Sequence, residues 1–149
     1  GYVLLFRESL MAHAKELGLR IVESSKHGFD QFDAATFVHD VFDAEDRPTA
    51  IINQASANVL NQVLQELQSA GLSVPDNVSV LSCGTYFEGE LMTQPITEMP
   101  VMPQELCSKA VELLVNAIES HTDIRGVVEL SRPAMHRHGS VAEVDVGER

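Results

Sequence analysis

Two histidines at alternate positions, His136 and His138, form the pattern in this chain that is most like a metal site. Side chains at i and i+2 of an extended segment point to the same face, so both imidazoles could approach one ion. Zinc sites usually add Cys or carboxylate ligands at short spacing, and neither residue type lies at such a spacing beside this pair. We therefore expect an exposed strand and no metal site. The other histidines lie in predicted surface segments and are assigned no role: His13, His27, His39 and His121.

Catalytic chemistry has little support in this sequence. It contains no nucleophile elbow, no Walker loop, no GxGxxG turn and no HExxH motif. The acidic pairs 40/43 and 88/90 are expected to lie on solvated faces, which does not favour general acid–base work. We expect a protein that is not an enzyme and uses no cofactor.

The two cysteines, Cys83 and Cys107, lie 24 positions apart and belong to no CxxC or Cys–His pattern. This spacing favours free, buried thiols over a disulfide framework or a zinc site, and it suits a reducing compartment such as the cytoplasm.

Composition places the chain among globular proteins and excludes two classes of partner. Its 149 residues include 44% hydrophobic residues, and 10 Lys and Arg against 22 Asp and Glu give a net charge of −12. The positive residues form no stripe that could follow a nucleic-acid backbone, and no apolar stretch is long enough to cross a bilayer. We expect neither direct nucleic-acid binding by this segment nor a membrane partner.

Alternating helical and strand patterns would position the polar residues. Helical periodicity predicts three helices in the first half of the chain. The first covers residues 3–17, although residues 2–6 would also suit the end of a strand. The second runs from a cap at Asp30 to residue 42, and the third runs from residue 59 to a stop at Gly71. Short apolar runs predict strands at 19–24, 49–53, 78–82 and, more briefly, 96–99.

The last third of the chain is predicted to contain one helix, two short strand-like pieces and a polar tail. Pro103 opens an amphipathic helix, two strand-like pieces follow at 125–131 and 134–141, and a polar tail ends the chain. The apolar face of the helix comprises Leu106, Ala110, Leu113, Leu114, Ala117 and Ile118.

Strands separated by helices describe βαβ units, which predict an α/β fold with a parallel, Rossmann-like sheet and helices on both faces. Ligands bind such sheets at the carboxyl ends of the strands. Those ends are expected at residues 24–26, 53–56 and 82–85.

The segment from residue 47 to 82 resembles the effector-binding domain of the lactose-repressor and galactose-repressor (LacI/GalR) family of transcription regulators. That family runs a PTA(I/V)xxxND strand into a helix and then a G-L-x-V-P-x-D-V-S-V turn and strand. The matching residues are Pro48, Thr49, Ala50, Ile51, Gly71, Leu72, Val74, Pro75, Val78, Ser79 and Val80. Weaker matches extend the resemblance over roughly residues 6 to 141, among them Pro95, Thr97, Glu105, Leu106, Pro133, His138 and Ser140.

The resemblance implies a periplasmic-binding-protein-like fold of type I, with two lobes and a ligand between them. We expect residues 1–99 to form the second lobe, 100–123 a returning segment whose helix packs on the first lobe, and 124–149 closing strands and a polar tail. The family's helix-turn-helix DNA reader and first lobe have no counterpart here. The apolar helix face needs a cover, so we expect self-association, as a homodimer.

The family's effector contacts can be transferred residue by residue. Asn53 matches the Asn of the N-D pair, and Gln54 takes the place of its Asp. The strand-end Asp of the family is Gly84 here, followed by Thr85. Val101 takes the place of a Gln, and Phe6 that of an Arg, with Arg7 beside it.

The candidate effector-binding residues are therefore Asn53, Gln54, Gly84, Thr85, Arg7 and Val101. Four polar contacts of the family are changed, which leaves two interpretations open: a ligand less polar than a sugar, or a regulator without effector control. Asn53 would also suit a simple strand-end or cap residue.

The function implied is that of a fragment of a bacterial LacI-type regulator. Such a protein senses a small molecule and transmits the change to operator DNA through a dimer, with DNA bound only by the amino-terminal domain. The alternative is the ligand-binding lobe of a periplasmic or extracellular sugar-binding protein that feeds a transporter.

Overall fold

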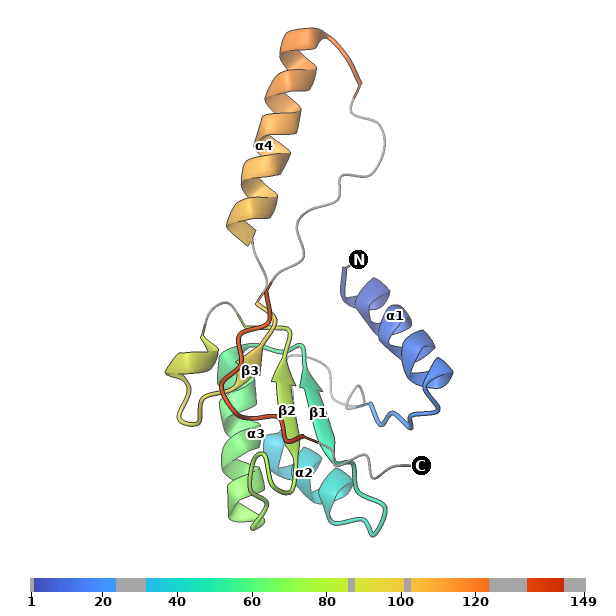
Figure 1. Cartoon of the computed structure of the whole chain (residues 1–149), viewed down its shortest axis with the longest axis vertical. Coiled ribbons are helices and arrows are strands. Elements are labelled where there is room, and N and C mark those ends of the chain that lie inside the picture. Colours follow the sequence, from blue (N-terminus) through green and yellow to red (C-terminus); the bar gives the residue numbers. More distant parts are fainter. Residues whose placement is uncertain (1, 24–31, 86–87, 101–102, 124–133, 144–149) are drawn as a thin grey trace. The chain divides into compact units, whose positions relative to one another are not determined.

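The computed structural model describes residues 2–23, 32–85, 88–100, 103–123 and 134–143 (Figure 1). The chain divides into two compact units, residues 1–48 and 49–149, and each is described by itself. None of the helices in the described ranges is long and apolar enough to span a membrane. The predicted boundaries of 1–99, 100–123 and 124–149 stay a prediction.

The first unit contains two helices, α1 (Tyr2–Glu16) and α2 (Ala34–Phe42). Helix α1 agrees with the prediction over 3–17, and residues 2–6 belong to it rather than to a strand. It ends at Glu16, and the predicted stop, Gly18, follows with a φ of +68° that suits glycine. The amide of Leu19 donates to the carbonyl of Ala14 at 2.8 Å, which closes the last turn.

Helix α2 is capped by Asp33 and not by Asp30, so the predicted cap was wrong. The Asp33 carboxylate accepts from the Ala35 amide at 3.1 Å and from the Thr36 hydroxyl at 2.6 Å. A side-chain acceptor at this position satisfies amides that the first helical turn leaves unpaired. Asp30 itself lies outside the described residues.

The prediction of a strand at 19–24 was also wrong, because residues 19–23, the part that the structure describes, are irregular. Val22 is 46% exposed, and no strand of the sheet pairs with this segment. A short apolar run becomes a strand only where a neighbour supplies the ladder of hydrogen bonds.

The second unit is built on a sheet of three strands, β1 (Ala50–Asn53), β2 (Ser79–Ser82) and β3 (Thr97–Glu98). They lie in the order β1-β2-β3, and both pairings are parallel, as predicted. Helix α3 (Ala57–Ser69) connects β1 to β2 and lies alongside the sheet in Figure 1. The buried side chains of α3 are spaced at three and four residues: Leu60, Val63, Leu64 and Leu67. The core of this unit also includes Leu72, Val78, Val80 and Ile96.

The closing segment, residues 134–143, returns to the sheet from far along the sequence. Predicted as a strand over 134–141, it forms a single antiparallel bridge, between His136 and Glu98. Ser140 joins it to the sheet again, since its amide carbonyl accepts from Val80 N at 2.7 Å. The strand predicted at 125–131 lies outside the described residues.

Helix α4 (Pro103–Ser120) begins at Pro103, as predicted (Figure 1). None of its residues from 104 to 120 is buried. Its apolar side chains are therefore available to a partner surface.

Candidate functional site

All three strands of the sheet end in a polar residue, and these residues are neighbours in register. Asn53 at the end of β1 is opposite Ser82 at the end of β2, and Ser82 is opposite Glu98 at the end of β3. The carboxyl ends of parallel strands are where α/β proteins place their ligand contacts. This edge, defined by Asn53, Ser82 and Glu98, is the candidate functional site.

Hydrogen bonds join the edge residues into one row. The Asn53 amide nitrogen donates to Ser82 Oγ at 3.0 Å and to the carbonyl of Ala55 at 2.9 Å. Thr85 Oγ1 lies 3.1 Å from Ser82 Oγ and 2.6 Å from Glu98 Oε2. Exposure is 8% for Asn53 and 1% or less for Ser82, Thr85 and Glu98. Buried polar groups that satisfy one another in this way hold the strand ends in a single arrangement.

In this row two of the predicted residues, Asn53 and Thr85, come together through Ser82; their contact with an effector stays a prediction. Asn53 is also a strand-end residue in the sense of the simpler alternative, because its side-chain oxygen accepts from the Ala55 amide at 3.1 Å. Ser82 lies in the strand end expected at 82–85 but was not among the candidate effector-binding residues, and Glu98 was not predicted at all. Their only signal was their place at the ends of two predicted strands, without a family motif to mark them.

Gly84 lies two residues after the end of β2, where two backbone segments meet. A Cβ atom at this position would lie 2.4 Å from both the carbonyl oxygen of Ala55 and the carbonyl carbon of Gln54. No side chain fits into such a space, so glycine here permits the close approach of the two segments. Gly84 therefore contributes only backbone at this edge. Its contact with an effector stays a prediction.

Gln54 is half-buried and carries the unsatisfied group of this edge. Its Nε2 is buried and has no hydrogen-bond partner among the described residues. An unpaired buried amide costs stability unless a ligand or water pairs with it. Among the predicted residues, Gln54 therefore has a side-chain donor, Nε2, that could bond to a ligand.

The two remaining predicted residues are Arg7 and Val101. Arg7 belongs to α1 in the first unit, where its guanidinium donates to Glu23, with Nη2 2.8 Å from Oε2. This hydrogen bond raises the pKa of Arg7 and lowers that of Glu23. Val101 lies outside the described residues. Both assignments stay predictions.

The cysteines differ in their surroundings. Cys83 is 6% exposed, and burial raises the pKa of its thiol, which disfavours the reactive thiolate. Cys107 is exposed on α4, so the expectation that both are buried was wrong for this residue. Both thiols are free, as predicted.

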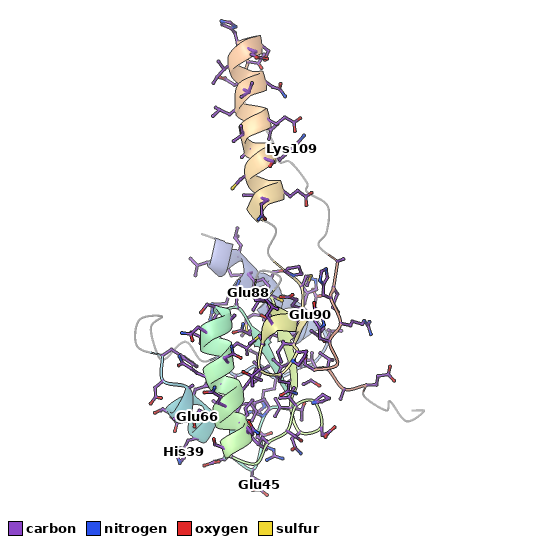
Figure 2. All side chains as sticks on the ribbon, turned by 90° about the vertical axis from the view of Figure 1, so that its left-hand side faces the viewer. His39, Glu45, Glu66, Glu88, Glu90 and Lys109 are labelled. Carbon is purple, nitrogen blue, oxygen red and sulfur yellow. The ribbon has the colours of Figure 1, made fainter. Side chains whose placement is uncertain are left out.

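The acidic pairs of the sequence lie at the surface. Glu88 precedes the short helix η2 (Gly89–Leu91) and Glu90 lies within it; both are exposed and are labelled in Figure 2. Asp40 and Asp43 are exposed on and after α2, next to His39. The hydrogen bond to Asp40 raises the pKa of His39, and the charge of Asp43 adds to this effect.

Two hollows are formed by other described residues, and neither is lined by an edge residue. One of about 300 Å³ is lined by α3 and the segments that follow it, including Asn61, Gln65, Gln68 and Gln94. Another, of about 640 Å³, lies within the first unit beside α1 and is lined mainly by apolar residues.

A parallel α/β sheet whose strands all end in polar residues at one edge is typical of the class of ligand-binding α/β lobes. Comparison with known families identifies the chain within that class. The model of the periplasmic binding protein-like domain matches residues 5–141. The chain belongs to this family. No match is found among curated proteins.

Solved structures with this fold include several transcription regulators. A LacI family regulator from Bifidobacterium animalis subsp. lactis has a TM-score of 0.77 and 21% identity, over 95% of this chain and 51% of its own. One from Arthrobacter sp. FB24, in complex with lactose, has a TM-score of 0.60 and 20% identity, over 91% and 50%. One from Lactobacillus casei with bound sucrose has a TM-score of 0.63 and 14% identity, over 90% and 50%. The chain thus spans about half the length of these proteins.

Proposed function

We propose that this chain is the effector-binding part of a LacI-type transcription regulator. The observation that carries the proposal is the row of polar residues Asn53, Ser82 and Glu98, in register at the carboxyl edge of a parallel sheet. This edge belongs to a periplasmic binding protein-like domain over residues 5–141. Regulators of this type among the solved structures support it over a transporter-linked binding protein.

The ligand would be a small molecule with hydrogen-bonding groups. The edge offers few groups to it, because Asn53, Ser82 and Thr85 already bond to one another. Gln54 Nε2 is the buried donor that remains unpaired among described residues. A ligand acceptor placed against this amide would gain a hydrogen bond and remove a buried unsatisfied group at once. Lactose and sucrose in two of the similar structures suggest sugars as the first compounds to try.

The rest of the proposal concerns the whole protein. Operator DNA would be bound by another domain of the full-length regulator, since the net charge of −12 in this chain opposes binding to phosphates. The regulator would act as a homodimer in the cytoplasm, and a ligand that prefers one arrangement of its lobes would shift its affinity for DNA. No catalytic step is part of this function.

The test begins with the full-length protein and a panel of sugars, nucleobases and other metabolites in a thermal-shift screen. A compound that raises the melting temperature is then titrated by calorimetry against the wild type and Gln54→Ala. We expect the variant to bind roughly fivefold more weakly, the equivalent of about 1 kcal/mol for one lost hydrogen bond. Anisotropy of labelled promoter DNA then measures whether the same compound changes DNA affinity.

Gln62→Ala is the matched control, because Gln62 is exposed on α3 and lies in neither the row nor the hollows described above. It should bind the compound as the wild type does. A protein that binds DNA but responds to no compound would contradict effector sensing, as would a compound that binds Gln54→Ala with undiminished affinity.

A further inference from the structure

Three side chains with metal-binding atoms meet at the end of β3. One ligand atom each of Glu98, His136 and His138 lies within 4.8 Å of those of the other two. Glu98 is the last residue of β3, whereas the histidines come from the closing segment. Two imidazoles and one carboxylate are a ligand set that zinc and related divalent ions use in proteins.

The backbone fixes these three residues relative to one another. Glu98 and His136 exchange two backbone hydrogen bonds, with N to O distances of 2.9 and 2.8 Å. Residues that pair in this way carry their side chains on the same face. His138 lies two residues further along, and its amide is 3.2 Å from Thr97 Oγ1. The backbone thus brings both imidazoles to the Glu98 carboxylate before any ion binds.

The carboxylate of Glu98 is the unusual member of this group. Glu98 is 1% exposed. Within the described residues its carboxylate forms no ion pair with Lys or Arg. A buried carboxylate is normally paired with a positive charge or bound to a metal. A divalent ion between the histidines and Glu98 would supply that charge.

We propose that Glu98, His136 and His138 form a binding site for a divalent transition-metal ion of the Zn²⁺ type. Zinc bonds of about 2.0 to 2.2 Å place tetrahedral ligand atoms roughly 3.4 Å apart. The limit of 4.8 Å between the ligand atoms means that small side-chain rotations complete the set. Three protein ligands leave a fourth position for water or another small ligand.

The surroundings of Glu98 suit this role. Thr85 Oγ1 donates to Oε2 at 2.6 Å, which orients the carboxylate in the way that outer hydrogen bonds orient metal ligands. On another side is Gly89, where a Cβ would lie 3.0 Å from Cδ of Glu98. Glycine leaves the space that the carboxylate occupies.

Binding would also link two distant parts of the sequence. The closing segment is held to β3 by the bridge between Glu98 and His136, and the ion would add three bonds across the same junction. An ion that binds only the folded form stabilises that form. The inference does not rest on the proposed effector binding, because it concerns metal affinity of this chain alone.

The test uses the 149-residue chain after removal of metal by a chelator. Zn²⁺ is titrated by calorimetry, and Co²⁺ is added as a spectroscopic probe whose ligand-field absorption reports coordination by nitrogen and oxygen. We expect one Zn²⁺ per chain and a higher melting temperature with Zn²⁺. Affinity should fall at least tenfold in His138→Ala, in His136→Ala and in Glu98→Gln.

His138→Ala is the decisive variant, because His138 is half-exposed and the hydrogen bond of its amide to Thr97 does not need the imidazole. Circular dichroism without metal checks that each variant is folded. The matched control is His13→Ala, an exposed histidine within α1, which should keep wild-type affinity. His39→Ala tests the competing group formed with Asp40 and Asp43.

The proposal is overturned if the wild type does not bind Zn²⁺, or if folded His138→Ala binds it as tightly as the wild type. Loss of binding in His39→Ala but not in His138→Ala would also overturn it, by placing the ion on α2. An effector response of the full-length regulator would be unaffected by any of these results, so the two proposals fail separately.

Discussion

Gly84 lies where the segment after β2 passes the loop between β1 and α3. Its φ is not in the left-handed region, and the need for glycine comes from space alone, since a Cβ would lie 2.4 Å from backbone atoms of Gln54 and Ala55. The family resemblance predicts that Gly84 takes the position of a ligand-binding Asp. It gives no information on how closely the two backbones approach, which depends on the packing of β1 against β2.

Gly84→Ala should therefore destabilise the fold by roughly 3 kcal/mol, because backbone atoms cannot move aside as the end of a side chain can. Gly71→Ala is the comparison: its Cβ would meet nothing within 4 Å, and only its φ of +75° is unfavourable, at about 1 kcal/mol. Urea unfolding followed by circular dichroism measures both. Equal stability of the two variants would show that the space around Gly84 relaxes at little cost.

Among the elements, the closing segment depends on one buried serine. Ser140 Oγ donates to the carbonyl of Val80 at 2.6 Å and accepts from the amide of Thr97 at 2.7 Å. Ser140 is fully buried, with 0% exposure. One hydroxyl thus completes the hydrogen bonding of two adjacent strands and attaches a segment that forms no regular strand of its own.

Ser140→Ala should cost about 1 to 3 kcal/mol, because it leaves the buried Thr97 amide without its acceptor. Ser69→Ala is a matched control, since Ser69 Oγ bonds to a backbone carbonyl of its own helix on an exposed surface. We expect that control to change stability by less than about 0.5 kcal/mol. The free energy of unfolding in urea measures the difference, and similar values for the two variants would contradict the role given to Ser140.

The sequence predicted best those elements whose formation depends on local pattern. Helix α3 has four buried residues at helical spacing, and the strands that flank it are short apolar runs. Residues 19–23 have a similar apolar run, but no strand within the described part of the chain pairs with them, so the pattern misled there. The group of Glu98, His136 and His138 was not predicted, because its residues are brought together by a bridge across 38 positions (98 to 136) and not by sequence spacing.

At the scale of the whole molecule, helix α4 presents apolar side chains that the other described residues of its own unit do not bury. Leu106, Leu114 and Ile118 are 57%, 53% and 65% exposed. These residues belong to the apolar face that the sequence predicts. Removing such side chains from water is favourable by roughly 25 cal/mol per Å² of apolar area, so a face of several large residues drives association when a matching surface is present.

Self-association of the 149-residue chain through α4 is therefore expected. Static light scattering over a range of concentrations should give a mass above that of one chain, 16.3 kDa, that approaches the monomer on dilution. The double variant Leu114→Gln and Ile118→Gln should shift the equilibrium to the monomer. Glutamine is uncharged and a good helix former, so both substitutions remove apolar surface without disrupting the helix. Asn116→Gln, an exposed polar change in the same helix, should leave the mass unchanged. A monomer at every concentration would mean that the exposed face of α4 does not bind a second copy.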